Sequence, residues 1–275
     1  MRDRFVGCML GVACGDALGA PYEGGPLEQI AWKLLSVGRD LRWTDDTEMT
    51  LVLAESLADR GRVDPDDLAR RWAREAGRTR GYGPGAWRLL AMIRDGADWR
   101  VANRAVFPDG SFGNGAAMRS APIGLCFGEP DGPATLAASI THAHPLGIEG
   151  AVLIARAVRG LPLEPRAPEY RERLDAARDL SMPPREVVRR LGNRVVAHES
   201  VVTAIHAANR FSDFEEMMAF IISLGGDVDT IGAMAGGIFG ARHGAAALPD
   251  LPLEQRDRIV RAAEALYSNF GSSFE

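Results

Sequence analysis

The chain has 275 residues, of which 46% are hydrophobic and 25% are charged, and its formal net charge at pH 7 is −5. This composition predicts a soluble globular protein, and the acidic balance argues against a nucleic-acid-binding surface. Cys8, Cys14 and Cys126 form no CxxC pair, which predicts reduced thiols in a cytoplasmic protein.

The N-terminal segment is apolar but is not expected to be a targeting or membrane segment. Asp3 disturbs the basic start of a signal peptide, and Asp16 ends the apolar run before it reaches the roughly 18 residues of a membrane span. Residues 2–20 are instead predicted to form a helix. Glycine recurs in it at every fourth position, namely at Gly7, Gly11, Gly15 and Gly19.

A second predicted helix, beginning at Thr230, carries the same glycine ridge. Its members are Gly232, Gly236, Gly240 and Gly244. Because glycine costs a helix up to ~1 kcal/mol per residue, such a ridge needs a compensating contact. We expect each ridge to admit a neighbouring helix at close range and both helices to lie at the packed centre of the molecule.

The remainder of the chain predicts further helices, and no alternating strand pattern is present. The fold class is therefore predicted to be all-α, in one compact domain over residues 1–275 without linker or repeat. The other expected helices cover residues 49–57, 64–75, 84–95, 135–143, 146–159, 169–180, 184–191, 199–209, 214–224 and 253–270.

An acidic, hydroxyl-rich stretch precedes the helix at 49–57. It contains Thr44, Asp45, Asp46 and Thr47 in succession. One Asp or Thr at a helix start is an ordinary N-cap, and an N-cap with additional polar neighbours is the simple explanation of this stretch. Two adjacent carboxylates flanked by threonines exceed that need, and packed oxygens of this kind suit a hard divalent cation.

A second acidic stretch lies at the start of the second glycine-ridged helix. Asp227 and Asp229 follow a Gly-Gly pair and precede Thr230. A cap with an Asx-turn would explain them individually. Two acidic clusters of similar chemistry nevertheless suggest a shared site, and they would repel each other unless cations neutralised them.

Glycine-rich loops supply a third signal. Residues 80–85 and 109–115 each precede an expected helix, the second one beginning at Ala116. Loops of this kind offer backbone N–H groups to phosphates, although neither is a P-loop and a structural turn is the alternative.

Glu23 lies in a loop after the first helix. His142 and His144 are too poorly spaced for a zinc pair and suit a cap or a ligand contact.

These motifs, in this order, resemble the ADP-ribosylglycohydrolase family, and the resemblance covers nearly the whole chain. The matching stretches are residues 11–19 (GVACGDALG), 44–47 (TDDT), 110–115 (GSFGNG), 141–142 (TH) and 226–230 (GDVDT).

The resemblance implies an all-α fold with a binuclear centre of two divalent cations, Mg²⁺ or Mn²⁺. Implied metal ligands are Thr44, Asp45, Asp46, Asp227, Asp229 and Thr230, with Asp229 as a bridge. Glu23, Asp46 and Asp229 are the implied catalytic residues. Implied contacts to ADP-ribose are Gly83, Phe107 (stacked on adenine), Gly110, Ser111, Phe112, Gly113, Asn114 and His142, with the 110–114 loop at the diphosphate.

The family reaction cleaves the bond at the anomeric carbon of the distal ribose. Two cations would chelate the ribose diol and polarise water, and Glu23 or a metal-bound hydroxide would act as acid or base. The substrate is expected to be arginine- or serine-linked ADP-ribose or O-acetyl-ADP-ribose. Residues 44–49 resemble the arginine-directed bacterial branch of the family, whereas residues 80–85 resemble the branch that acts on serine-linked ADP-ribose, O-acetyl-ADP-ribose and poly(ADP-ribose). Arginine-directed bacterial members carry an aspartate where this chain has Gly81, which favours the O-linked substrates. The expected partner is an ADP-ribosylated protein, and a monomer is expected. The alternatives are a catalytically silent ADP-ribose binder and a metal-dependent hydrolase of another nucleotide.

Overall fold

The computed structural model describes residues 1–24, 26–36 and 40–271. Within these ranges the chain forms helices and two isolated bridges, Leu41 with Leu253 and Gly113 with Val196, and it forms no strand. The α-helices are α1 (Arg2–Gly19), α2 (Pro26–Ser36), α3 (Asp45–Arg60), α4 (Pro65–Glu75), α5 (Pro84–Arg94), α6 (Trp99–Val106), α7 (Ala121–Cys126), α8 (Asp131–Ser139), α9 (Pro145–Arg159), α10 (Pro168–Ala177), α11 (Pro184–Arg190), α12 (Ala197–Arg210), α13 (Phe214–Leu224), α14 (Val228–His243) and α15 (Arg256–Phe270).

The all-α prediction is confirmed, with four local corrections. Helices α2 and α6 were not predicted, and α8 begins and ends four residues earlier than expected. The helix expected to begin at Ala116 is wrong, because Asn114–Ala116 is a single 3₁₀ turn and regular helix starts only at Ala121. His142 and His144 lie in the connection between α8 and α9, where His144 caps α9 by accepting from Leu146 N at 3.2 Å.

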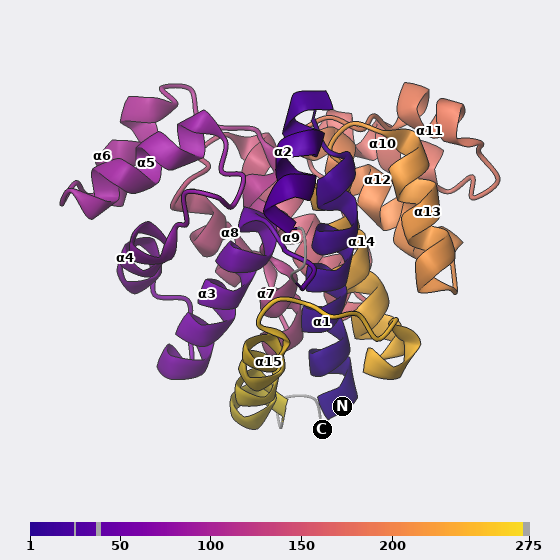
Figure 1. Cartoon of the computed structure of the whole chain (residues 1–275). Helices are drawn as coiled ribbons and strands as arrows, with labels where there is room; N and C mark the ends of the chain where they lie inside the picture. Colours follow the sequence, from indigo (N-terminus) through magenta and orange to yellow (C-terminus); the bar gives the residue numbers. More distant parts are fainter. Residues whose placement is uncertain (25, 37–39, 272–275) are drawn as a thin grey trace.

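The two glycine-ridged helices form the centre of the molecule, as predicted. Helix α1 lies alongside α14 over most of its length (Figure 1). A Cβ atom built at Gly7, Gly11, Gly15 or Gly19 would come within 3.0 Å of the α14 backbone or its flanking residues. The ridges therefore allow backbone-to-backbone contact that alanine would prevent. Gly244, the last predicted member of the second ridge, lies just beyond α14 with a φ of 82°, and a Cβ there would meet the Asp3 side chain instead.

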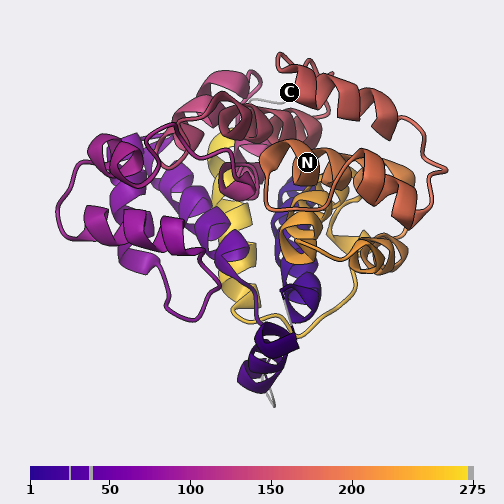
Figure 2. The same cartoon turned by 90° about the horizontal axis from the view of Figure 1, so that it is seen from above.

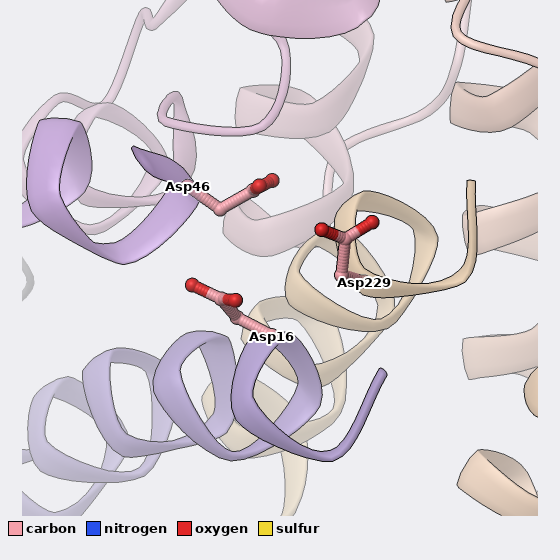
Figure 3. A group of neighbouring side chains, drawn as sticks. All are labelled: Asp16, Asp46 and Asp229. Carbon is pink, nitrogen blue, oxygen red and sulfur yellow. The ribbon is translucent and has the colours of Figure 1, made fainter. Parts of the chain in front are cut away.

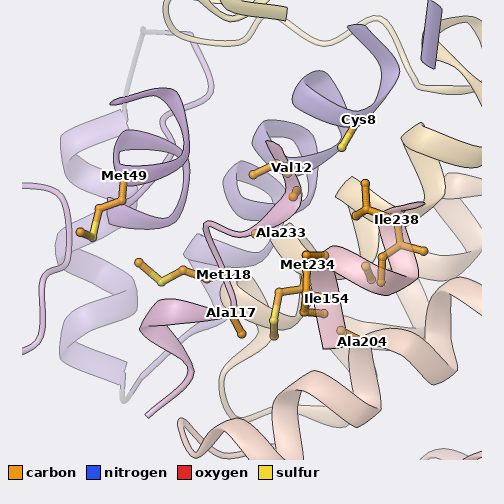
Figure 4. Close-up of a cluster of buried hydrophobic side chains, with 14 of the residues drawn as sticks. Cys8, Val12, Met49, Ala117, Met118, Ile154, Ala204, Ala233, Met234 and Ile238 are labelled. Carbon is orange, nitrogen blue, oxygen red and sulfur yellow. The ribbon is translucent and has the colours of Figure 1, made fainter. Parts of the chain in front are cut away.

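Two groups of helices flank this pair. Helices α3 to α6 lie on one side, and α10 to α13 lie on the other (Figure 1). Helix α2 projects beyond the other helices when the molecule is seen from above (Figure 2). Apolar side chains from both sides meet at the central pair in one continuous core that includes Val12, Met118, Ile154, Met234 and Ile238 (Figure 4).

The segment Arg2–Tyr22 is long and apolar enough to cross a membrane, counting only the described residues. However, 83% of its most apolar window is buried inside the fold. Its apolar character is thus explained by its central position against α14 and α15.

Candidate active site

A cavity of about 440 Å³ opens where the start of α3, the start of α14 and the glycine-rich loops meet. Its volume suits a nucleotide-sized ligand, since ligand pockets commonly enclose about 300–1,000 Å³. Most of the predicted site residues line it, although they come from segments more than 200 residues apart. They are Glu23, Asp45, Asp46, Gly83, Phe107, Ser111, Gly113, Asn114, His142, Asp227, Asp229 and Thr230.

The first acidic stretch forms the N-terminus of α3. Thr44 caps the helix, with its Oγ1 accepting from Asp46 N at 3.2 Å and donating to Asp46 Oδ2 at 2.8 Å. The capping role thus belongs to Thr44, and the carboxylates of Asp45 and Asp46 are left to face the cavity. Thr44 itself is buried and is not part of the cavity wall.

The second acidic stretch is set by a tight turn before α14. Gly225 and Gly226 have φ angles of 63° and 77°, which glycine adopts without strain. Asp227 follows at the N-cap position, but its carboxylate makes no capping bond and instead accepts from Asn114 Nδ2. The predicted Asx-turn alternative is therefore absent at Asp227, and its carboxylate faces the cavity beside Asp229.

Asp16 of α1 is a site residue that the sequence reasoning did not assign. It is fully buried and accepts from Thr44 N and Thr47 N at 3.0 Å, and from Thr47 Oγ1 at 2.5 Å. Its carboxylate points toward those of Asp46 and Asp229 (Figure 3). The available signal was a carboxylate within the apolar, glycine-ridged part of α1 that follows its charged first turn, because a core position holds a charge only when it has partners.

The carboxylates form two triads that share one residue. Asp16, Asp46 and Asp229 each offer an oxygen within 4.8 Å of the others, and so do Glu23, Asp227 and Asp229. Asp229 thus stands between two places at which a cation would find three carboxylate oxygens. The bridging role implied for Asp229 stays a prediction, and its place in both triads is the observation that bears on it.

The electrostatics of the triads require neutralisation. Burial raises the pKa of Asp16 to about 6 and that of Asp227 to about 7, with Glu23 adding repulsion at Asp227. Burial, reinforced by neighbouring carboxylates, also raises the pKa of Asp46 and Asp229 well above the usual range. Asp46 Oδ1 is buried without a hydrogen-bond partner among the described residues, so one oxygen is left for a ligand that is not a protein group.

The glycine-rich loops line the cavity only in part. Phe107 packs over Gly85 and joins the wall. Ser111, Gly113 and Asn114 also contribute, whereas Gly110 packs against the backbone of Ala143 and His144.

Phe112 is the other predicted contact that lies outside the wall. It is 45% exposed and packs edge-on against His144, with ring centroids 5.5 Å apart. Gly110 and Phe112, which were predicted to contact ADP-ribose, therefore do not line the cavity.

A buried polar network supports the loop that holds Gly81. Glu48 accepts from Gly77 N and from Tyr82 Oη at 2.9 Å, and Arg80 binds Glu254 while stacking on the Trp43 ring at 3.6 Å. A Cβ built at Gly81 would lie 3.5 Å from Asp45 Oδ1. This loop thus closes directly over Asp45, and no sequence motif had indicated the role of Glu48 or Arg80.

The chain also matches a known protein family and several known proteins over nearly its whole length. The family model for ADP-ribosylglycohydrolase matches residues 1–274. The chain is 33% identical to ADP-ribosylhydrolase ARH3 of Bos taurus, covering 90% of this chain and 87% of that protein. It is 29% identical to the ADP-ribosyl-[dinitrogen reductase] glycohydrolase of Rhodospirillum rubrum, with 98% of each chain covered.

Among solved structures, one described as an ADP-ribosylglycohydrolase-related protein complex superposes with a TM-score of 0.73. It shares 30% sequence identity and covers 98% of both chains. The fold, the five ordered motifs and the full-length family match lead to one assignment. The chain belongs to the ADP-ribosylglycohydrolase family.

Proposed function

We propose that this chain is a metal-dependent ADP-ribosyl hydrolase that cleaves the bond at the anomeric carbon of the distal ribose. The observation that carries the proposal is the pair of carboxylate triads sharing Asp229 at one cavity. The family assignment and relatives named for ADP-ribosyl hydrolysis support the same reaction.

The residues present fit two divalent cations. Asp16, Asp46 and Asp229 would hold one cation, Glu23, Asp227 and Asp229 would hold the second, and Asp45, Thr44 and Thr230 lie beside them. All of these groups are oxygen donors, which Mg²⁺ and Mn²⁺ prefer. When bound, the cations would supply charge neutralisation, orientation of the ribose hydroxyls and Lewis acidity.

The reaction also needs a group that moves a proton. Glu23 is half-buried, lines the cavity and follows the short 3₁₀ turn after α1. Glu23 would offer one carboxylate oxygen to the cation, and its other oxygen can take a proton from the attacking water or return one to the leaving group. The carboxylates of Asp46 and Asp229 are placed to stabilise the positive charge that develops on the ribose ring in an oxocarbenium-like transition state.

The favoured linkage is an O-glycosidic one, as in ADP-ribosylated serine or O-acetyl-ADP-ribose. Gly81 leaves no side chain beside Asp45, where arginine-directed bacterial members of the family carry an aspartate. A neutral position here provides no carboxylate to pair with a guanidinium leaving group.

The test is release of ADP-ribose from a serine-linked and an arginine-linked peptide, each with Mg²⁺, Mn²⁺ or EDTA. The proposal expects release from the serine-linked peptide that EDTA abolishes. Release from the arginine-linked peptide alone would refute the preferred linkage. Binding of ADP-ribose without release from either peptide or from O-acetyl-ADP-ribose would favour a silent binder.

A further inference from the structure

Arg119 is a buried cation in the cavity wall with no role in the chemistry described above. Its side chain is only 2% exposed and stacks on the Trp72 ring, with the guanidinium carbon 3.9 Å from the ring centroid. Its terminal nitrogens donate to Thr141 Oγ1 at 2.7 Å and to Met49 Sδ at 3.5 Å. No carboxylate forms an ion pair with it in the described part of the chain, and its Nε has no hydrogen-bond partner there, which is unusual for a buried arginine.

The contact between Arg119 and Thr141 determines where the protons lie. Arginine can only donate, so Thr141 Oγ1 must accept from it. The same hydroxyl lies 2.7 Å from His142 Nδ1. Among the described hydrogen bonds, Nδ1 is the one acceptor that the hydroxyl proton can reach. The reverse arrangement, with Nδ1 protonated, would leave that buried hydroxyl proton without an acceptor.

His142 therefore accepts at Nδ1 and carries its proton on Nε2. The Nε2 atom lies toward the glycine-rich loop, since Cβ atoms built at Gly113 and Gly115 would be 3.7 and 3.6 Å from it. His142 and both glycines line the cavity. Burial, together with the charge of Arg119, lowers the pKa of His142 to about 3, so the ring is neutral at pH 7.

We propose that Arg119 is a positioning residue, which acts through Thr141 to fix His142 as a neutral donor whose Nε2–H points at an acceptor oxygen of the bound substrate. This inference rests on the proposed function, because it concerns the same cavity. The expected acceptor is an anionic oxygen such as that of a phosphate group, which the positive charge of Arg119 also favours.

The first test is the tautomer of His142, read by long-range ¹H–¹⁵N NMR with Mg²⁺ at pH 7. His142→Asn assigns its signals among the five histidines. The wild type should show protonated Nε2 and unprotonated Nδ1. In Arg119→Met the Thr141 hydroxyl is free to accept from the ring, so a mixture of tautomers is expected. Protonated Nδ1 in the wild type, or an unchanged tautomer in Arg119→Met, would overturn the proposal.

The second test measures the affinity for ADP-ribose and for Mn²⁺ in the same variants. Arg119→Met and Thr141→Val should each weaken ADP-ribose binding by about tenfold, while Mn²⁺ affinity stays unchanged. Thr141→Ser keeps the hydroxyl and should restore both the tautomer and the affinity. Arg185→Met, at an exposed position of α11, is the matched control.

Equal loss in Thr141→Ser and Thr141→Val would show that packing, and not proton direction, is responsible. The proposed function fails separately. A wild type that fixes the predicted tautomer but binds neither ADP-ribose nor Mn²⁺ would refute the reaction and leave the hydrogen-bond arrangement of Arg119, Thr141 and His142 standing.

Discussion

Replacing Gly15 by alanine tests whether the glycine ridge of α1 supports both the fold and the cation site. A Cβ at this position would overlap the backbone carbonyl of Gly232 on α14. A backbone oxygen cannot rotate away as a side chain can, so one central helix must shift. Overpacking of this kind costs about 1–3 kcal/mol, and alanine recovers up to about 1 kcal/mol of helix propensity.

The net loss expected for Gly15→Ala is about 1–2 kcal/mol, which corresponds to a Tm lower by about 2–8 °C. Calorimetry of the EDTA-treated protein measures it without a contribution from bound ions. Gly132→Ala is the matched control, because Gly132 lies in the first turn of α8 and no atom lies within 4 Å of the place that the new methyl group would take. The control should leave the Tm unchanged or raise it.

The same substitution should also weaken cation binding. Gly15 directly precedes Asp16, and Gly232 lies three residues after Asp229, so a shift between the helices separates two carboxylates of one triad. Displacing the support of metal ligands typically costs 10–100-fold in affinity. If Gly15→Ala matched the control in both Tm and Mn²⁺ affinity, close helix packing would not be what positions these carboxylates.

Further substitutions and pH separate the roles of the remaining site residues. Asp229→Asn should abolish Mn²⁺-induced thermal stabilisation, because Asp229 belongs to both triads. Asp46→Asn should keep the cation that Glu23, Asp227 and Asp229 would hold, and equal numbers of bound ions in the two variants would refute the sharing of Asp229. Glu23→Gln should lower turnover by at least about a hundredfold while ADP-ribose still binds, and unchanged turnover would exclude Glu23 as acid or base. Without metal, Asp227 keeps its proton in the folded state up to pH about 7 but loses it near pH 3.8 in the unfolded state. The free energy of unfolding should therefore fall as pH rises from 3.8 to 7, and it should fall less steeply in Asp227→Asn. Equal slopes in the two proteins would contradict the raised pKa. Phe107→Ala should weaken ADP-ribose binding by about tenfold through lost base stacking, and an undiminished affinity would place the adenine elsewhere.

The sequence predicted the helical class and most of the site because the relevant signals are local. Capping chemistry at Thr44 and the Gly-Gly turn before Asp227 can be read within a few residues. The glycine ridges also predicted the central helix pair, because glycine at every fourth position has few other uses. The monomeric state, the span of one domain over the whole chain and the cytoplasmic location stay predictions.

The parts that could not be predicted depend on contacts between distant segments. Asp16 becomes a site residue only when α1 brings it under the start of α3. Arg119 and Thr141 are 22 residues apart, and their pairing follows from the tertiary arrangement alone. Phe112 shows the reverse, since its motif suggested a ligand contact but the loop turns its ring toward His144.

The most direct test of the central claim is to return Mn²⁺ stepwise to EDTA-stripped protein while counting bound ions and measuring ADP-ribose release from a serine-linked peptide. The two triads predict that release is absent in the stripped protein and reaches its full rate when two ions are bound per chain. Full release from protein that holds no ion would contradict the account.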